Sequence, residues 1–453
     1  MKIPAFLNPP QQQRFMQKLS FRIRTVAKIA MLFTMVPFSV TVGDNVSWPF
    51  RGGPTMNGHV GEADSVGLPT EFDEATGKNI KWRVKLEGLG HSTPIVGGEK
   101  IWLTSATEDG RQQFVYCLDA ESGKVLHHNL LFENEEPESL NNNINTYASP
   151  SCALEDAAVY VHFGSYGTAR LNPETAEVVW QRRDINCRHF RGPGSSPIIF
   201  QDLLILTFDG VDAQFLTALD KHTGKTVWRT NRSTDYGDLD ENGEPKREGD
   251  LRKAYSTPAL VEVNGRTQVV SVGSRAGFAY DALTGEEIWG IRHDDFNAAA
   301  PPSFYKNFAI LNTGSRGANL IAVELNDTTK GDVSESHVKW NRDKGNSRLA
   351  APLLISNRIY MITDTGVANC VNADTGEEIW KDRVGGTHVA SPITANGMIY
   401  FCSEEGDVTV IKAADEFEVV SKNHIADGMR ASPSAAQGRL YLRTFGYLYC
   451  IGQ

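Results

Sequence analysis

An eleven-residue pattern that occurs five times constrains the fold of this chain more than any other feature. Each copy joins two apolar runs through a turn that opens with Asp or Asn, usually with Gly four residues later and Trp eight residues later. The copies are "LDAESGKVLHH" from Leu118, "LNPETAEVVWQ" from Leu171, "LDKHTGKTVWR" from Leu219, "YDALTGEEIWG" from Tyr280 and "VNADTGEEIWK" from Val371.

The residue types of this pattern predict a β-hairpin. An Asx side chain accepts hydrogen bonds from the backbone N–H groups just ahead of it, and Gly adopts a positive φ without strain. Apolar runs on both sides are typical of paired strands. Two copies depart: Ala176 replaces the Gly of the second, so we expect a different turn geometry there, and His127 replaces the Trp of the first.

A second marker sets the number of units. Short "xSP"-like patterns such as "STP", "ASP" and "AAP" end at eight prolines spaced 40 to 61 residues apart, and two apolar runs follow each one. These are Pro94, Pro150, Pro197, Pro258, Pro302, Pro352, Pro392 and Pro433. Each unit thus offers four strands, and Asn326 opens a longer hairpin that leads to Trp340.

The two ends of the chain complement each other. The last unit stops after its third strand at "FGYLYCIGQ", and an unassigned strand, "NIKWRVKL", precedes the first proline. Eight four-stranded units of this period predict an all-β fold, an eight-bladed β-propeller closed by pairing of the N- and C-terminal strands. An all-β solenoid would not explain the complementary ends. One aromatic side chain per blade should dock on the next blade; the candidates are Trp82, Trp180, Trp228, Trp289, Trp340 and Trp380.

The charge balance and the N-terminus bear on partners and location. The 453 residues carry a formal net charge of −10, which argues against nucleic acid as a partner. Residues 1–43 combine basic residues with an apolar stretch over 29–40, typical of a signal peptide or an N-terminal anchor, and Met16 is an alternative start. We expect an exported, periplasmic or envelope-associated monomer with a lead-in segment over 44–78, a propeller over 79–453 and no membrane span beyond the N-terminal segment.

The six cysteines show neither metal-binding spacing nor adjacent pairs. Cys117 and Cys370 stand two residues before a turn-opening Asx, in a slot that holds Ala218 and Ala279 in other units. A position that alternates between Cys and Ala requires a small buried side chain. We therefore expect free thiols.

With its "LDxxTGxxxW" turns and "xSP" strand starts, the chain resembles the PQQ-binding-like β-propeller repeat family over residues 48–453. That family includes quinoprotein alcohol dehydrogenases and the outer-membrane assembly protein BamB. The segments "WPFRGGPTMNG" and "KWRVKLEGLGHSTP" also resemble a group of exported bacterial proteins with this repeat. The resemblance implies the fold and leaves the activity open, because the repeat is structural.

The sequence favours a binding protein over an enzyme. The quinoprotein enzymes that it resembles carry an adjacent Cys–Cys disulfide and a calcium ion beside PQQ, and this chain has no adjacent cysteines. The amide-rich stretch "NNNINTYASP" over 141–150 offers oxygens for Ca²⁺, although a solvated loop has the same composition. The sequence assigns no catalytic residue, metal ligand or cofactor, and PQQ with calcium is retained as an alternative together with a BamB-like assembly role.

The axial face of the propeller is the predicted site. The first strand of each blade lines the central channel, so the residues just before these strands should converge on the axis. The candidates are His91, Asn145, Tyr147, Arg191, Tyr255, Arg348, His388 and Arg430. They favour a small anion, or a protein or peptide partner with carboxylates, and His388 should strengthen binding as the pH falls toward 6.5. In the alternative, a mixed polar rim, the arginines pair with Asp364 or Glu404.

Overall fold

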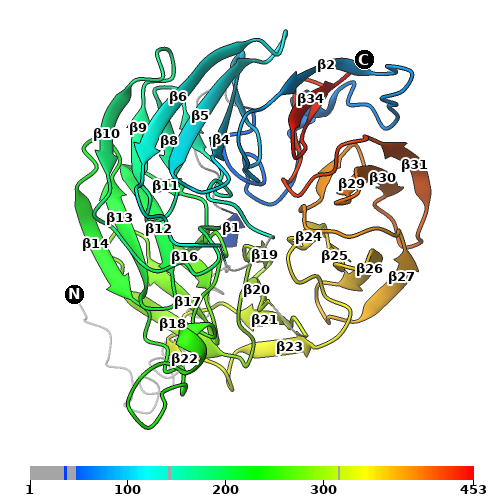
Figure 1. Cartoon of the computed structure of the whole chain (residues 1–453). Helices are drawn as coiled ribbons and strands as arrows, with labels where there is room; N and C mark the ends of the chain where they lie inside the picture. Colours follow the sequence, from blue (N-terminus) through cyan, green and yellow to red (C-terminus); the bar gives the residue numbers. More distant parts are fainter. Residues whose placement is uncertain (1–34, 38–46, 141–143, 315–316) are drawn as a thin grey trace, which may run out of the picture. The chain divides into compact units, whose positions relative to one another are not determined.

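Eight antiparallel sheets are arranged around a central axis, which confirms the predicted eight-bladed β-propeller (Figure 1). The computed structural model describes residues 35–37, 47–140, 144–314 and 317–453. Most of the predicted N-terminal leader, residues 1–34 and 38–43, lies outside the described residues. No helix in the described part of the chain is long and apolar enough to cross a bilayer.

The first four blades follow the chain order from the axis outward. Their strands are β3 (Ile95–Gly97), β4 (Lys100–Ala106), β5 (Gln112–Asp119) and β6 (Val125–Glu133); β7 (Ala153–Glu155), β8 (Ala158–His162), β9 (Thr168–Leu171) and β10 (Val178–Arg182); β11 (Ile198–Phe200), β12 (Leu203–Asp209), β13 (Gln214–Asp220) and β14 (Thr226–Asn231); β15 (Ala259–Val263), β16 (Arg266–Val272), β17 (Ala276–Asp281) and β18 (Glu287–Arg292). The fourth blade gains β1 (Met35–Pro37) beside β15 and β22 (Gly331–Asp332) beside β18.

The last four blades repeat this plan. Their strands are β19 (Ser303–Tyr305), β20 (Phe308–Asn312), β21 (Leu320–Glu324) and β23 (Val338–Arg342); β24 (Leu353–Ile355), β25 (Arg358–Ile362), β26 (Val367–Asn372) and β27 (Glu378–Arg383); β28 (Ile393–Ala395), β29 (Met398–Cys402), β30 (Asp407–Lys412) and β31 (Val419–His424); β32 (Ser434–Ala436), β33 (Arg439–Arg443), β34 (Tyr447–Ile451) and β2 (Ile80–Lys85).

The eighth blade closes the ring as the sequence predicts. β2, from the start of the propeller, pairs antiparallel with β34, from the end of the chain, and Trp82 stands opposite Cys450. Figure 1 shows β2 and β34 side by side near the C-terminus. Because β34 gains a partner in this way, the last blade has no strand missing at its outer edge.

The tryptophan that recurs in the repeat makes the same contact in five blades. The indole Nε1 of one blade donates to a backbone carbonyl in the turn of the next blade, with N···O distances of 2.9 to 3.3 Å. The pairs are Trp82–Ala120, Trp180–Lys221, Trp228–Ala282, Trp340–Ala373 and Trp380–Ala414. The turn itself forms as predicted: Asp220 Oδ1 accepts the Thr223 N–H at 2.7 Å.

Trp289 differs from the other tryptophans. Its Nε1 donates to Gln268 Oε1 of its own blade at 3.0 Å, and the side chain is fully buried. The next blade has the longer Asn326 hairpin in place of the short turn, and this hairpin lays β22 alongside Trp289. The Trp therefore packs beneath an added strand instead of binding a turn.

The two residues that depart from the repeat, Ala176 and His127, lie against each other. The Ala176 turn keeps the ordinary geometry, with φ of 56° and a hydrogen bond from its N–H to the Asn172 carbonyl, so the expected difference in turn geometry is wrong. At Gly224, by contrast, a Cβ would lie 2.8 Å from the Trp180 ring, so glycine is needed for space as well as for φ. His127 packs on the Ala176 turn, and its ring Nε2 lies 3.2 Å from the Glu174 carbonyl oxygen. The smaller imidazole explains why a methyl group is tolerated there.

The Cys and Ala slot lies beside the docking tryptophans. Cys450, Ala218 and Cys370 stand directly opposite Trp82, Trp228 and Trp380 on the neighbouring strand, which explains the small side chain. All six cysteines are buried and free, as predicted. Burial raises the pKa of the Cys117 thiol to about 12.

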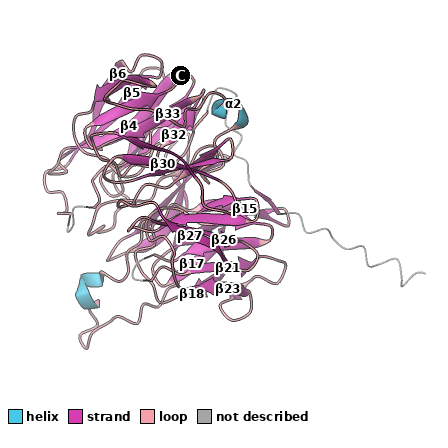
Figure 2. Cartoon of the chain, turned by 90° about the vertical axis from the view of Figure 1, so that its right-hand side faces the viewer, coloured by secondary structure: helices cyan, strands magenta, loops and turns pink. Residues whose placement is uncertain are grey.

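The segment before β2 crosses one face of the propeller. It contains α2 (Glu62–Ser65), whose first residues bind the eighth blade through the hydrogen bond from the Gly438 N–H to the Asp64 carbonyl. On the other face a long connection between β14 and β15 carries the short 3₁₀ helix η1 (Lys246–Gly249). Figure 2 shows the two helices on opposite sides of the ring.

Candidate functional site

A cavity of about 340 Å³ lies on the axis, where the first strands of the blades begin. Six of the eight predicted residues line it: His91, Asn145, Arg191, Tyr255, Arg348 and Arg430. Short apolar side chains and amides complete the wall, among them Leu349, Val389 and Asn297. The volume is within the range of small-ligand pockets, about 300–1,000 Å³.

Two predicted residues lie outside this cavity. Tyr147 is buried beneath a neighbouring loop, where its hydroxyl donates to the Glu138 carbonyl at 2.8 Å. His388 is 1% exposed, and its two ring nitrogens lie 2.8 and 3.1 Å from the carbonyl oxygens of Gly385 and Cys402. Burial lowers the pKa of His388, which opposes the expectation that it becomes charged near pH 6.5.

The lining of the axial cavity is cationic. It contains four arginines, Arg51, Arg191, Arg348 and Arg430, and no aspartate or glutamate. Three of them reach carboxylates outside the lining: Arg348 pairs with Asp364, Arg430 with Glu404, and Arg191 lies 3.6 Å from Asp250. The pairs of the mixed-rim alternative therefore form, and the same arginines line the cavity, whereas their carboxylate partners do not.

Arg51 was missed by the sequence analysis because it belongs to the lead-in segment and follows no strand-starting proline. Its Nη2 donates to Ser391 Oγ at 3.0 Å, and no carboxylate pairs with it among the described residues. Burial lowers its pKa to about 10. The glycine-rich "FRGGP" stretch was the available signal, since an arginine held between tight turns is fixed in position.

A second unpaired guanidinium lies just behind the cavity wall. Arg443 is 2% exposed and donates to the hydroxyl and carbonyl of Ser92, again without a carboxylate partner in the described part of the chain. Burial lowers the pKa of Arg443 to about 9. Burial, together with Arg443 and Arg430, lowers the pKa of His91 to about 3, so that imidazole is neutral at physiological pH. Uncompensated buried charge is costly, and a bound anion would relieve it.

The cavity wall contains buried polar atoms that lack hydrogen-bond partners in the described structure. Among them are the hydroxyl of Tyr255 and Oδ1 of Asn297. Asn297 also has a φ of 61°, a left-handed conformation that costs energy for a residue other than glycine. Unsatisfied polar groups and backbone strain both occur at binding sites, where a ligand completes the hydrogen bonding.

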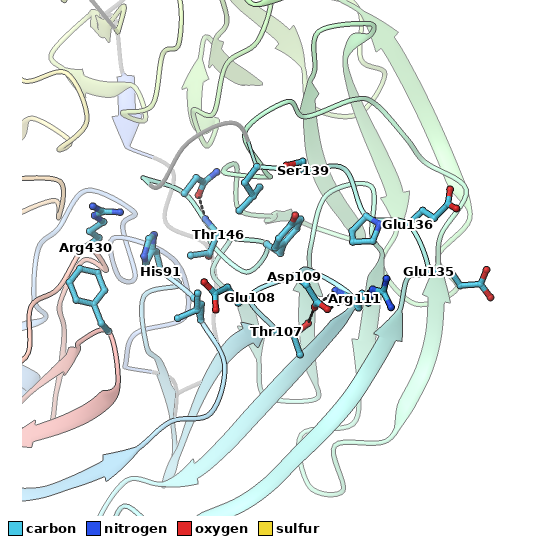
Figure 3. A pocket seen from close by; sticks show the side chains of 17 residues that line it. His91, Thr107, Glu108, Asp109, Arg111, Glu135, Glu136, Ser139, Thr146 and Arg430 are labelled. Carbon is cyan, nitrogen blue, oxygen red and sulfur yellow. Dashed lines mark hydrogen bonds and ion pairs between the residues drawn. The ribbon is translucent and has the colours of Figure 1, made fainter.

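A groove of about 720 Å³ continues from the cavity over the first blade. His91, Asn145 and Arg430 line both spaces and so connect them. The remaining charged lining residues of the groove are Glu108, Asp109, Arg111, Glu135 and Glu136. Figure 3 shows Arg430 and His91 at one end of the groove, Glu108 near His91, and Glu135 and Glu136 at the far side.

The family resemblance implies two cofactors, PQQ and calcium. The residues of the axial cavity suit the first of these, PQQ. PQQ is a polycarboxylate, and the four arginines of the cavity suit carboxylates. No group of three or more His, Cys, Asp or Glu side chains that could hold a metal ion is found among the described residues. Three asparagines of the amide-rich stretch, Asn141, Asn142 and Asn143, lie outside the described residues.

Fold and site together define an eight-bladed propeller with a cationic axial cavity. The family model described as "Outer membrane protein assembly factor BamB" matches residues 38–207, 212–353 and 324–419. The chain belongs to this family, which agrees with the repeat resemblance seen in the sequence.

Relatives in the family are distant. An outer membrane protein assembly factor BamB from Legionella pneumophila is 25% identical over 47% of this chain and 49% of its own length. BamB from Marinobacter adhaerens is 26% identical over 22% of this chain and 25% of its own length, so this chain spans half or less of these two relatives. BamB from Yersinia pestis is 21% identical over 75% of this chain and 80% of its own length.

Solved structures share the fold at low sequence identity. BamB from Moraxella catarrhalis superposes with a TM-score of 0.56 and 12% identity, over 83% of this chain and 99% of that one. Quinohemoprotein alcohol dehydrogenase from Comamonas testosteroni gives a TM-score of 0.59 and 13% identity, over 89% of this chain and 80% of that one. An assembly factor and an enzyme therefore share this architecture, and the fold alone does not separate the two functions.

Proposed function

We propose that this chain is an exported, non-catalytic scaffold of the cell envelope that binds an anionic ligand, or the carboxylates of a protein or peptide partner, in its axial cavity. Membership of the BamB family supports the envelope location and a protein partner. The observation that carries the proposal is a cavity with four arginines and no carboxylate in its lining, in a chain of net charge −10.

The binding chemistry follows from the geometry. Arg348 and Arg430 line the cavity while each pairs with a carboxylate, Asp364 and Glu404, so both guanidinium groups are held in place at the cavity wall. Arg51 adds a cation without an acidic partner. Charge-assisted hydrogen bonds from several guanidinium groups strengthen one another, and salt weakens the part of this attraction that is exposed to solvent.

Calorimetric titration with citrate tests the proposal. We expect binding at low salt that weakens as the ionic strength rises, and that is at least tenfold weaker in the Arg348→Ala, Arg430→Ala double variant. Arg358→Ala is the matched control, because Arg358 also pairs with a carboxylate, Asp415, but does not line the cavity. No citrate binding by the wild type, or equal binding by the double variant, would contradict the proposal.

The quinoprotein alternative is tested with the same protein. PQQ and Ca²⁺ are added, and dye-coupled oxidation of methanol and ethanol is followed. A scaffold with this cavity can bind PQQ as a polycarboxylate but will not oxidise either alcohol. Turnover above the PQQ-only blank would overturn the non-catalytic assignment.

A further inference from the structure

The lead-in segment spans the end of the axial channel opposite the cavity mouth. At its start, Trp48 exchanges two backbone hydrogen bonds with Val96 of the first blade, at 2.8 and 3.0 Å. At its end, Gly58 accepts the Thr394 N–H of the seventh blade at 2.8 Å, and the Val60 N–H donates to the Thr394 carbonyl. Between these ends, Phe50 belongs to a core cluster that contains Ile199 of the third blade, four blades from the seventh, so residues 49–57 cross the ring.

This crossing closes the channel. Between the segment and the strand-starting prolines of the fifth to eighth blades, the remaining space is only about 20 Å³. The crossing is tightly fitted, since a Cβ at Gly53 would lie 2.9 Å from the Trp48 ring and one at Gly58 would lie 2.8 Å from the Pro392 carbonyl oxygen. Trp48 and Phe50 are almost completely buried and anchor it.

Arg51 is carried by this crossing and lines both the closed end and the axial cavity. It is therefore the cation that a ligand meets at the bottom of the pocket, whereas Arg348 and Arg430 come from the blades. Ser391 accepts one of its N–H groups, which holds the side chain in place. The two glycines that follow it have φ of 84° and 81°, so the turn that presents Arg51 is set by the backbone.

A closed pocket with a cation at its end selects the shape of its ligand. An extended polypeptide cannot pass through it, so only a chain end or a small anion reaches Arg51. The wall offers apolar contact from Leu349 and Val389 and an amide from Asn297, which suits the last residue of a peptide. The shared edge with the groove over the first blade leaves a way out for the preceding residues.

We propose that the lead-in segment converts the axial channel into a blind pocket that captures the C-terminal carboxylate of a polypeptide, with Arg51 as the anchoring cation. This inference rests on the proposed function and deepens it. It assigns a role to the "WPFRGGPTMNG" motif, which the repeat architecture does not require. Backbone and guanidinium donors are a common means of recognising terminal carboxylates.

The test compares two forms of one peptide. N-acetylated Gly-Ser-Gly-Ser-Ala-Leu is titrated by calorimetry as the free acid and as the C-terminal amide, so that only the terminal charge differs. We expect the acid to bind at least tenfold more tightly than the amide. In Arg51→Gln the two forms should bind alike, and Arg51→Lys should keep a reduced preference for the acid. Arg358→Gln is the control and should keep the full preference.

Each outcome bears on a defined claim. Equal binding of acid and amide by the wild type, or a full preference for the acid in Arg51→Gln, overturns the inference. If citrate binds but neither peptide does, the inference fails and the proposed function stands. If neither citrate nor the peptides bind, both fail. The melting temperature of each variant is measured first, and Arg51→Lys, which keeps the charge, serves if Arg51→Gln does not fold.

Discussion

The outer edge of the ring and its axis are built by opposite rules. At the outer edge, the same contact recurs: a tryptophan of one blade donates to the turn of the next, as Trp180 does to Lys221 and Trp380 to Ala414. At the axis, the residues before the first strands differ from blade to blade, with His91, Tyr255 and Arg430 each three residues before the strand-starting proline of its blade. Repetition at the edge holds the blades together, and variation at the axis creates a particular binding site.

The difference also separates two kinds of electrostatic environment. At the edge, charged groups are exposed and paired, as in Lys412 with Glu418. Near the axis, Arg51 and Arg443 are held without carboxylate partners in the described residues, and burial lowers the pKa of both. Burial of these unpaired charges at the axis lowers the stability of the fold, whereas the paired charges at the edge do not. Such a loss of stability is typical of functional sites. Five measurements test whether the edge and the axis differ in this way.

Removal of the closing strand should have the largest effect. A chain that starts at Glu87 lacks β2, so β34 becomes an open edge and the Trp82 contact is lost. We expect it to aggregate or to melt far below the full chain in circular dichroism. A chain that starts at residue 47 is the control and should melt like the full chain. Equal melting of the two shortened chains would contradict ring closure through β2.

The docking tryptophans come next. Trp228→Ala removes a side chain that is 7% exposed and should cost about 3–5 kcal/mol of unfolding free energy. His127→Ala, at the equivalent place in the first blade, should cost only about 0.5 kcal/mol because that side chain is partly exposed. Urea unfolding measures both. Similar costs for the two variants would show that the blade junctions do not depend on tryptophan.

Substitutions of the turn glycine should change the stability less. The size of the change should depend on the side chain that packs on the turn. Gly224→Ala should cost about 1–2 kcal/mol for the left-handed backbone alone, with a further cost from the Trp180 ring. Ala176→Gly should change stability by less than about 1 kcal/mol. His127→Trp should destabilise the protein alone but not together with Ala176→Gly. Additive effects in this double-mutant cycle would disprove the steric link between the two positions.

The repeat made the fold predictable, while the site was predictable only in part. The eleven-residue turns and the prolines fix the strands locally, so blade number and ring closure follow from spacing. Six axial residues could be placed because each precedes a first strand. Arg51 could not, because its position depends on a crossing that contacts blades far away in sequence. His388 has the expected place in sequence, but its backbone turns the ring inward to Gly385 and Cys402.

The lowered pKa of His91 results mainly from burial and, to a smaller extent, from the positive charges of Arg443 and Arg430. Its folded-state pKa is lowered to about 3, below the unfolded value of about 6.5. The unfolded chain therefore binds a proton that the folded chain does not, and stability is lost as the pH falls below 6.5. His91→Gln should reduce this loss by about 1 kcal/mol at pH 5.5. Calorimetric melting of both proteins at pH 7.5 and 5.5 measures it; an identical loss would show that folding does not lower the pKa of His91.

The most direct test of the division between edge and axis measures stability and binding on the same samples. The Arg348→Ala, Arg430→Ala variant is compared with wild type by calorimetric melting and by citrate titration at low salt. Both side chains line the cavity, and Arg430 also pairs with Glu404 of the seventh blade. We expect a fall in melting temperature of only a few degrees and at least tenfold weaker citrate binding. Unchanged citrate binding, or a collapse of melting temperature together with binding, would contradict an axis built for an anionic ligand.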